Sequence, residues 1–138
     1  MMGESSAKVL SADQAKAMRS SLYIAGPLVD YKSKGFSTEL LGRFDFEGVS
    51  AYRIRLFDDA ANDVTYDLEP NNYFIMKATF KAKVNGVDVT STSYFSNYKK
   101  TDNGYTMAYT IGTDLGVVEY SKVEFNQDID PQTFAAPQ

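Results

Sequence analysis

The sequence predicts an α+β domain that is mainly β: a curved antiparallel meander sheet of about seven strands, open like a half-barrel, with an N-terminal helical segment packed on one face. Ten Tyr and nine Phe favour strands, where flat rings pack well on a pleated surface. Beyond Gly35 apolar and polar residues alternate with a period of two, and turn-forming residues recur about every eight to twelve residues. That spacing is typical of a meander or an open barrel.

A chain of 138 residues fits one domain that can bury a core without disulfides or metals. We divide it into a flexible N-terminus (1–10), a helical segment (11–35), an antiparallel sheet (36–127) and a C-terminal tail (128–138). Whether an upstream part is missing is left open.

The helical segment is predicted from its start signal. Ser11-Ala12-Asp13-Gln14 reads as a capping box, with Ser11 as the N-cap and Gln14 reaching back to it. Ala15, Met18 and Leu22 then form a narrow apolar stripe, Gly26-Pro27 interrupts the helix, and Gly35 ends the helical part.

The strands are predicted between clusters of turn formers. Asn85-Gly86 is the sharpest of these clusters, because both residues tolerate the positive φ angles of a two-residue hairpin. We expect strands at 37–45, 49–57, 63–69, 73–84, 87–98, 105–111 and 115–126.

The alternation gives the sheet one apolar face. In the strand before Asn85, Phe74, Met76, Ala78 and Phe80 share that face, and the intervening positions are largely polar. One helix of about a dozen residues spans only about 18 Å, too little to cover seven strands. Sheet curvature, a partner, an absent segment or a ligand must account for the rest.

The apolar face supplies the candidate site, a lining for lipid. The alternative reading of the same side chains, an ordinary core, stays open. Met side chains suit an adaptable wall because the thioether repacks easily. The lining candidates are Met18, Leu22, Tyr52, Ile54, Leu56, Tyr66, Phe74, Met76, Phe80 and Phe95.

The composition argues against catalysis. The chain has no His and no Cys, which excludes the commonest general base, thiolate zinc sites and His-activated nucleophiles. The carboxylates Asp58, Asp59 and Asp63, and the pair Asp128 and Asp130, are interpreted as turn residues. We therefore expect no enzyme, no catalytic residue, no metal and no cofactor.

The charge and hydropathy limit the partners. A net charge of −4 disfavours nucleic acid, and no stretch reaches the roughly 18 apolar residues of a transmembrane segment. The basic residues concentrate at five lysines that either meet anionic headgroups or simply solubilise the sheet: Lys77, Lys81, Lys83, Lys99 and Lys100.

From Pro27 onward the order of features resembles the C-terminal half of the bacterial outer-membrane lipoprotein-sorting proteins, the LolA/LolB-like superfamily. Each matching segment is a hairpin or strand end, and their order and spacing carry the resemblance. Relatives commonly carry a Pro shortly after the segment that corresponds to residues 96–104, whereas this chain has Met107-Ala108-Tyr109 there. The segments are 26–35 (GPLVDYKSKG), 39–42 (ELLG), 46–56 (FEGVSAYRIRL), 66–69 (YDLE), 96–104 (SNYKKTDNG) and 123–137 (VEFNQDIDPQTFAAP).

The resemblance implies a curved, unclosed sheet whose helices lie against its concave face and enclose a hydrophobic cavity for lipoprotein acyl chains. It implies a periplasmic or outer-membrane-associated carrier that needs apolar area, at about 0.8 kcal/mol per buried methylene, and no catalytic residue. Relatives have further strands before the helical segment, whereas about ten polar residues precede it here. A protein-interaction or envelope-sensor module, or a self-associating structural domain that forms a homo-oligomer, remain as alternatives.

Overall fold

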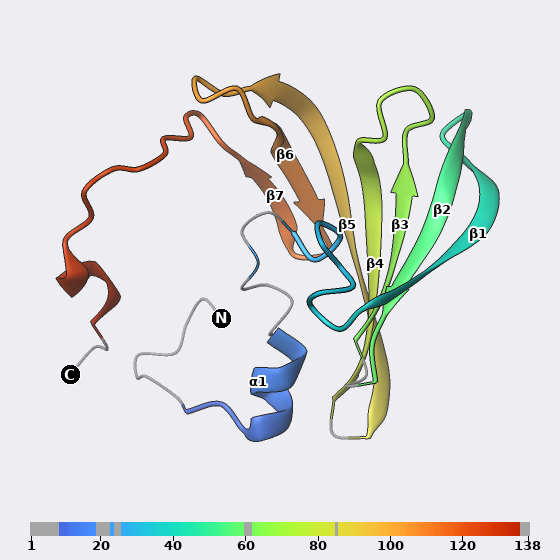
Figure 1. Cartoon of the computed structure of the whole chain (residues 1–138), viewed down its shortest axis with the longest axis horizontal. Helices are drawn as coiled ribbons and strands as arrows, with labels where there is room; N and C mark the ends of the chain where they lie inside the picture. Colours follow the sequence, from blue (N-terminus) through green and yellow to red (C-terminus); the bar gives the residue numbers. More distant parts are fainter. Residues whose placement is uncertain (1–8, 19–22, 24–25, 60–61, 85, 136–138) are drawn as a thin grey trace.

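The computed structural model describes residues 9–18, 23, 26–59, 62–84 and 86–135. Its main element is one antiparallel sheet of seven strands in the order β1-β2-β3-β4-β5-β6-β7, which is the predicted meander (Figure 1). The sheet is not closed into a barrel. The strands are β1 (Ser37–Phe46), β2 (Val49–Phe57), β3 (Asp63–Leu68), β4 (Ile75–Val84), β5 (Val87–Lys100), β6 (Thr106–Thr113) and β7 (Gly116–Glu119).

Two-residue turns join the strands of the first and fourth hairpins. In the first, Phe46 pairs with Val49, and the intervening Glu47 and Gly48 have φ angles of 50° and 83°. Positive φ at both positions is the signature of a type I′ turn, whose twist matches that of the strands. In the fourth, Val84 pairs with Val87 and Gly86 has a φ of 80°, while Asn85 lies outside the described residues.

The predicted last strand, 115–126, was too long. β7 ends at Glu119, and only the backbone N–H of Tyr120 continues the pairing, donating to the carbonyl of Tyr109 at 2.8 Å. Beyond that point Phe125 stacks on Tyr105 with ring centroids 5.5 Å apart. Here the contact is between side chains, and not between paired backbone groups of neighbouring strands. The period of two survives because the segment is extended, although it is no longer a strand.

The predicted helical segment over 11–35, packed on the sheet, is not supported. The capping hydrogen bonds exist: Ser11 N–H donates to Gln14 Oε1 at 2.9 Å, and Gln14 N–H donates to Ser11 Oγ at 3.2 Å. The helix α1 that follows covers only Ala12–Met18, and Met18 is 45% exposed. Residues 27–35 form successive turns, in which positive φ at Asp30 and Gly35 prevents a continuous helix.

Irregular chain, rather than helix, covers the apolar side of the sheet. We call Tyr23 together with residues 26–36 the cover segment. Its side chains Tyr23, Leu28, Tyr31 and Phe36 pack against the sheet, and Phe36 is 7% exposed. The cover segment lies on the side toward which β6 and β7 bend (Figure 1).

Lys34 holds the cover segment together. Its ammonium donates to the carbonyl oxygens of Gly26 and Val29, the former at 3.1 Å, and lies 4.6 Å from the centre of the Tyr23 ring. A charged group that satisfies two backbone carbonyls replaces part of the hydrogen bonding that a helix would have supplied.

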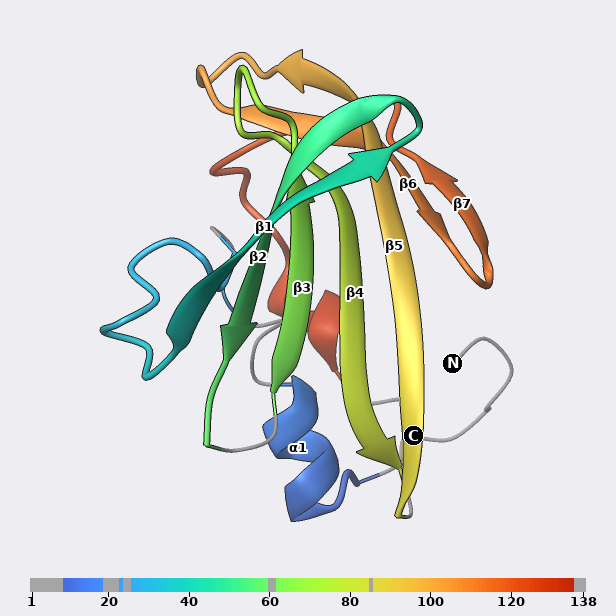
Figure 2. The same cartoon turned by 90° about the vertical axis from the view of Figure 1, so that its right-hand side faces the viewer.

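The sheet curls in the other direction at the β1–β2 turn. Figure 2 shows this hairpin bending forward across the sheet. Phe46 of β1 and Tyr94 of β5 come within 6.2 Å, ring centre to ring centre, although three strands separate β1 from β5 in the sheet order. A bulge at Leu41, where β1 carries one extra residue between Leu40 and Gly42, interrupts the edge of the sheet.

Candidate functional site

The apolar face is built from residues that the strand register places side by side. Ile54, Tyr66 and Ala78 form one row across β2, β3 and β4, and Leu56, Val64 and Phe80 form the next. Leu56, Val64, Tyr66 and Ala78 are buried, with Leu56 only 1% exposed. We call these six residues together with Phe95 the apolar face; the cover segment packs on it.

The predicted lining residues divide into two groups. Leu56 and Tyr66 are fully part of the core, which agrees with the alternative reading of these side chains. Ile54, Phe80 and Phe95 pack against that core but remain partly exposed. Burial raises the pKa of the Tyr66 phenol to about 12, because the charged phenolate is poorly solvated there. On the apolar face, Ile54, Phe80 and Phe95 are thus the lining candidates that keep some exposed surface.

The other candidates lie elsewhere. Phe74 stacks on Tyr98 at 4.5 Å, and Tyr52 pairs with Tyr73 at 6.2 Å. Met76 is half-buried. Met18 lies on α1 and is largely exposed, and Leu22 is outside the described residues.

A bulge explains why the alternation misplaced part of β4. Asp67 pairs with Lys77, but Leu68 pairs with Ile75, so β4 carries an extra residue at Met76. The side-chain alternation changes at that point. Ile75, which the sequence pattern placed on the polar side, packs against the core. The Pro70-Asn71-Asn72 turn shortly before β4 was the available signal of irregular backbone.

The opposite side of the sheet, which we call the charged face, carries ion pairs between β2 and β3. Arg55 donates from Nε and Nη2 to the two carboxylate oxygens of Asp63, at 3.0 and 2.9 Å. This guanidinium lowers the pKa of Asp63 below its ordinary value. Arg53 makes the equivalent pair with Asp67, and hydrogen bonding to that carboxylate raises the pKa of Arg53. The period of two places Arg53, Arg55 and Asp67 at the polar positions of their strands, but it does not show which side chains pair.

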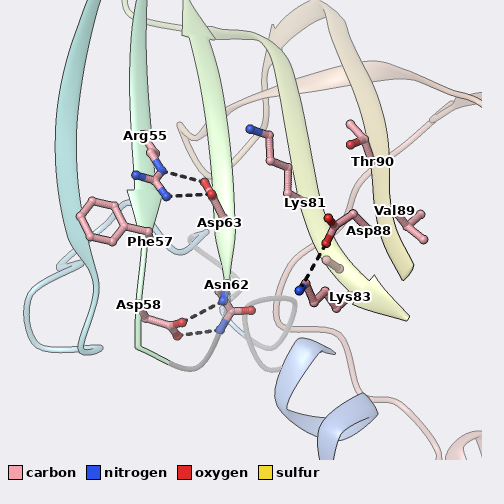
Figure 3. Close-up of a pocket in the computed structure, with 11 residues that line it drawn as sticks. Arg55, Phe57, Asp58, Asn62, Asp63, Lys81, Lys83, Asp88, Val89 and Thr90 are labelled. Carbon is pink, nitrogen blue, oxygen red and sulfur yellow. Dashed lines mark hydrogen bonds and ion pairs between the residues drawn. The ribbon is translucent and has the colours of Figure 1, made fainter. Parts of the chain in front are cut away.

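An open pocket of about 540 Å³ lies on the charged face, between the end of β2, β3 and the β4–β5 hairpin (Figure 3). Sequence reasoning did not find it, because it is formed by strands whose ends meet only in the folded sheet. Its lining consists of Arg55, Phe57, Asp58, Asn62, Asp63, Lys81, Ala82, Lys83, Asp88, Val89 and Thr90.

Asp58 and Asp130 lie in turns, as the sequence predicted, but the interpretation of Asp63 as a turn residue was wrong, because Asp63 begins β3 and pairs with Arg55. Asp58 accepts two hydrogen bonds from Asn62, at 2.9 Å from the backbone and 2.6 Å from the side chain. Asp130 accepts from Gln132 N–H at 2.9 Å and caps the short 3₁₀ turn Pro131–Phe134. In the part of the chain that the structure describes, no three His, Cys, Asp or Glu residues gather into a metal-binding group. Among the same residues no helix is long and apolar enough to cross a membrane.

The comparisons with known proteins point to one fold. A crystal structure described as an outer membrane lipoprotein-sorting protein domain from Vibrio parahaemolyticus matches with a TM-score of 0.54 and 19% sequence identity. The match covers 73% of this chain and 46% of that one, so the chain spans about half the length of the solved structure. The similarity is one of fold. It confirms at that level the resemblance seen in the sequence. No protein-family model and no curated protein matches the chain.

Proposed function

We propose that this chain is a non-enzymatic domain that binds the acyl chains of lipid or lipoprotein on its apolar face, as a carrier module of the periplasm or outer membrane. The observation that carries the proposal is the way the apolar face is covered. Turns, and not regular structure, pack on it in the described part of the chain, and Ile54, Phe80 and Phe95 of the same face stay partly exposed.

The physical chemistry of the face suits acyl chains. Its neighbouring rows contain only aliphatic and aromatic side chains, so a ligand there gains free energy from apolar area alone, about 0.8 kcal/mol for each buried methylene. A carrier of this kind moves its cargo without a covalent step and therefore needs no catalytic residue. The fold shared with a domain described as lipoprotein-sorting supports both the ligand class and the envelope location.

The proposal is tested by displacement of a fluorescent fatty acid and by native mass spectrometry of the purified chain. We expect saturable binding that Phe95→Ser weakens, because Phe95 packs on the apolar face. Tyr94→Ser is the matched control. Tyr94 precedes Phe95 in β5 but contacts Phe46 on the charged face, so its loss should leave fatty-acid affinity unchanged.

Two results would contradict the proposal: the absence of any bound lipid in both measurements, or equal loss of affinity in the two variants. Thermal unfolding of both proteins shows whether a loss of binding merely follows a loss of folded protein. Since Phe95 is only partly buried, Phe95→Ser should still fold.

One observation favours a second candidate, self-association through β7. This edge strand and the turn before it expose apolar side chains: Leu115 is 97% exposed, Val117 68% and Val118 49%. An open edge with apolar side chains can pair with another strand. Sedimentation velocity at rising concentration tests this, with Val117→Lys as the variant. A monomer at every concentration excludes it.

A further inference from the structure

The pocket on the charged face is distinct from the apolar face, because its charged lining residues lie on the other side of the same strands. The register shows this directly: Asp63 pairs with Lys81, while the adjacent Val64 pairs with Phe80 of the apolar face. Successive residues of a strand point to opposite faces. A ligand in the pocket and an acyl chain on the apolar face therefore occupy separate sites.

Each carboxylate of the pocket is already engaged. Asp63 accepts two hydrogen bonds from Arg55, and Asp58 accepts two from Asn62. Asp88 is 3.9 Å from the ammonium of Lys83. The acidic groups therefore have little capacity left for a cation from solution.

Lys81 is in a different position. Its charge acts on Asp63, but among the described residues its ammonium makes no hydrogen bond and no ion pair within 4.0 Å. The side chain extends from β4 into the pocket beside Asp63 (Figure 3). An ammonium has three donors and no acceptor, so this group is available to an anion.

The rest of the pocket lining indicates which chemical group the anionic ligand should carry. Phe57, which pairs with Asp63 and lies on the same face, gives the pocket apolar surface near the lysine, whereas Ala82 and Val89 line the pocket with side chains that alternate toward the apolar face. Its volume of about 540 Å³ is within the range of small-molecule sites. A bare inorganic ion would leave this apolar surface uncovered.

We propose that this pocket binds a small amphiphile, a single anionic group on a short apolar stem, with Lys81 as the anion-binding residue and the Phe57 ring in contact with the stem. The anionic group is a phosphate, as in a lipid headgroup, or a carboxylate, as in a short fatty acid. Lys83, two residues away on the same side of β4, adds positive potential but is partly neutralised by Asp88.

The experiment is an NMR titration of the ¹⁵N-labelled chain with hexyl phosphate and, separately, with hexanoate. Inorganic phosphate and hexyl glucoside serve as the anion without a stem and the stem without an anion. We expect saturable shifts at residues 55–63 and 81–90 with at least one of the two amphiphiles, and at least tenfold weaker binding of each control compound. The tighter of the two amphiphiles identifies the anion as phosphate or carboxylate.

The variants separate the role of Lys81 from general charge. Lys81→Met keeps the aliphatic stem and removes the ammonium, and should weaken the amphiphile about tenfold, the loss expected for one hydrogen bond to a charged group. Lys122→Met removes a charge outside the pocket, where Lys122 pairs with Glu124 at 2.8 Å, and should change the affinity less than about twofold.

Several results would overturn the proposal: no saturable shift at the pocket residues, binding of inorganic phosphate as tight as that of both amphiphiles, or unchanged affinity in Lys81→Met. Lys81 is exposed, so its substitution should not affect folding, and the wild-type shift map gives an answer that does not depend on any variant. The shift map and the Lys81→Met result are both independent of fatty-acid binding at the apolar face. The titration can be repeated in Phe95→Ser, in which every pocket residue is unchanged.

Discussion

Arg53 and Asp67 face each other on β2 and β3 and form a bidentate ion pair, with Nε donating to Oδ1 at 2.5 Å and Nη2 donating to Oδ2 at 2.8 Å. Asp67 is 2% exposed, and the guanidinium also lies 4.1 Å from the centre of the Phe44 ring on β1. The pair thus joins three strands on the side of the sheet opposite the apolar face.

Loss of this pair should destabilise the fold. Arg53→Met leaves the Asp67 carboxylate buried without its counter-ion, and we expect the free energy of unfolding to fall by about 2 kcal/mol, between the values for exposed and fully buried pairs. Urea unfolding followed by circular dichroism measures it. In the exposed pair of Lys122 and Glu124, Lys122→Met should cost less than about 0.5 kcal/mol. Equal effects in the two variants would contradict the prediction.

Stability should decrease in acid through Asp63. The Arg55 guanidinium holds the pKa of Asp63 below its ordinary value of 3.8. A carboxyl whose folded-state pKa is lowered stabilises the fold above the unfolded pKa, and this contribution disappears as the pH falls through the folded pKa. Below about pH 4, the wild type should therefore lose stability more steeply than Asp63→Asn. Urea midpoints measured from pH 5 to pH 2 provide the test, and parallel slopes in the wild type and Asp63→Asn would contradict the prediction.

At high pH, stability should decrease through Tyr66. Burial raises the pKa of its phenol from 10.0 to about 12, so the neutral form is favoured in the folded state. A raised folded-state pKa gives stability that is complete below the unfolded pKa and is lost as the pH rises through the folded pKa. Between pH 10 and 12 the wild type should lose stability with a steeper slope than Tyr66→Phe. Parallel slopes in the two proteins would show that Tyr66 does not carry this dependence.

A better-suited residue in the β1–β2 turn should stabilise the fold. Glu47 has a φ of 50°, a left-handed conformation that Asn adopts more readily. We expect Glu47→Asn to raise the free energy of unfolding by about 0.5 kcal/mol, and Gly48→Ala, at a φ of 83°, to lower it by about 1 kcal/mol. Thermal unfolding of both variants decides the matter, and a stabilising Gly48→Ala would be inconsistent with the type I′ turn.

Much of the fold could be predicted because its information is local. Alternation and turn formers located the sheet and its order, since a meander pairs each strand with its neighbour in the chain. The capping residues at Ser11 and Gln14 marked the start of α1 for the same reason. The same period of two also predicted that Leu56 and Phe80 lie on the apolar face.

The remainder depends on contacts between distant parts of the chain. The extra residue at Met76 moves Ile75 into the core without any change in composition. β7 ends at Glu119, and the contact of Phe125 with Tyr105 beyond it joins residues that are distant in the chain, so neither followed from the local pattern. The pocket at Lys81 is lined by residues of β2, β3, β4 and β5, which only the pairing of the folded sheet brings together.

The cover segment would compete with any ligand of the apolar face, because it packs on that face. Tyr23, Leu28, Tyr31 and Phe36 pack on the apolar face, which is the surface proposed for an acyl chain, and the two carbonyl contacts of Lys34 tie the cover segment to itself. Under the proposed function, an acyl chain would have to displace these side chains, and its apparent affinity would be lower by the factor set by the fraction of molecules in which the face is uncovered. The return of the same segment to the face would then favour release of the cargo.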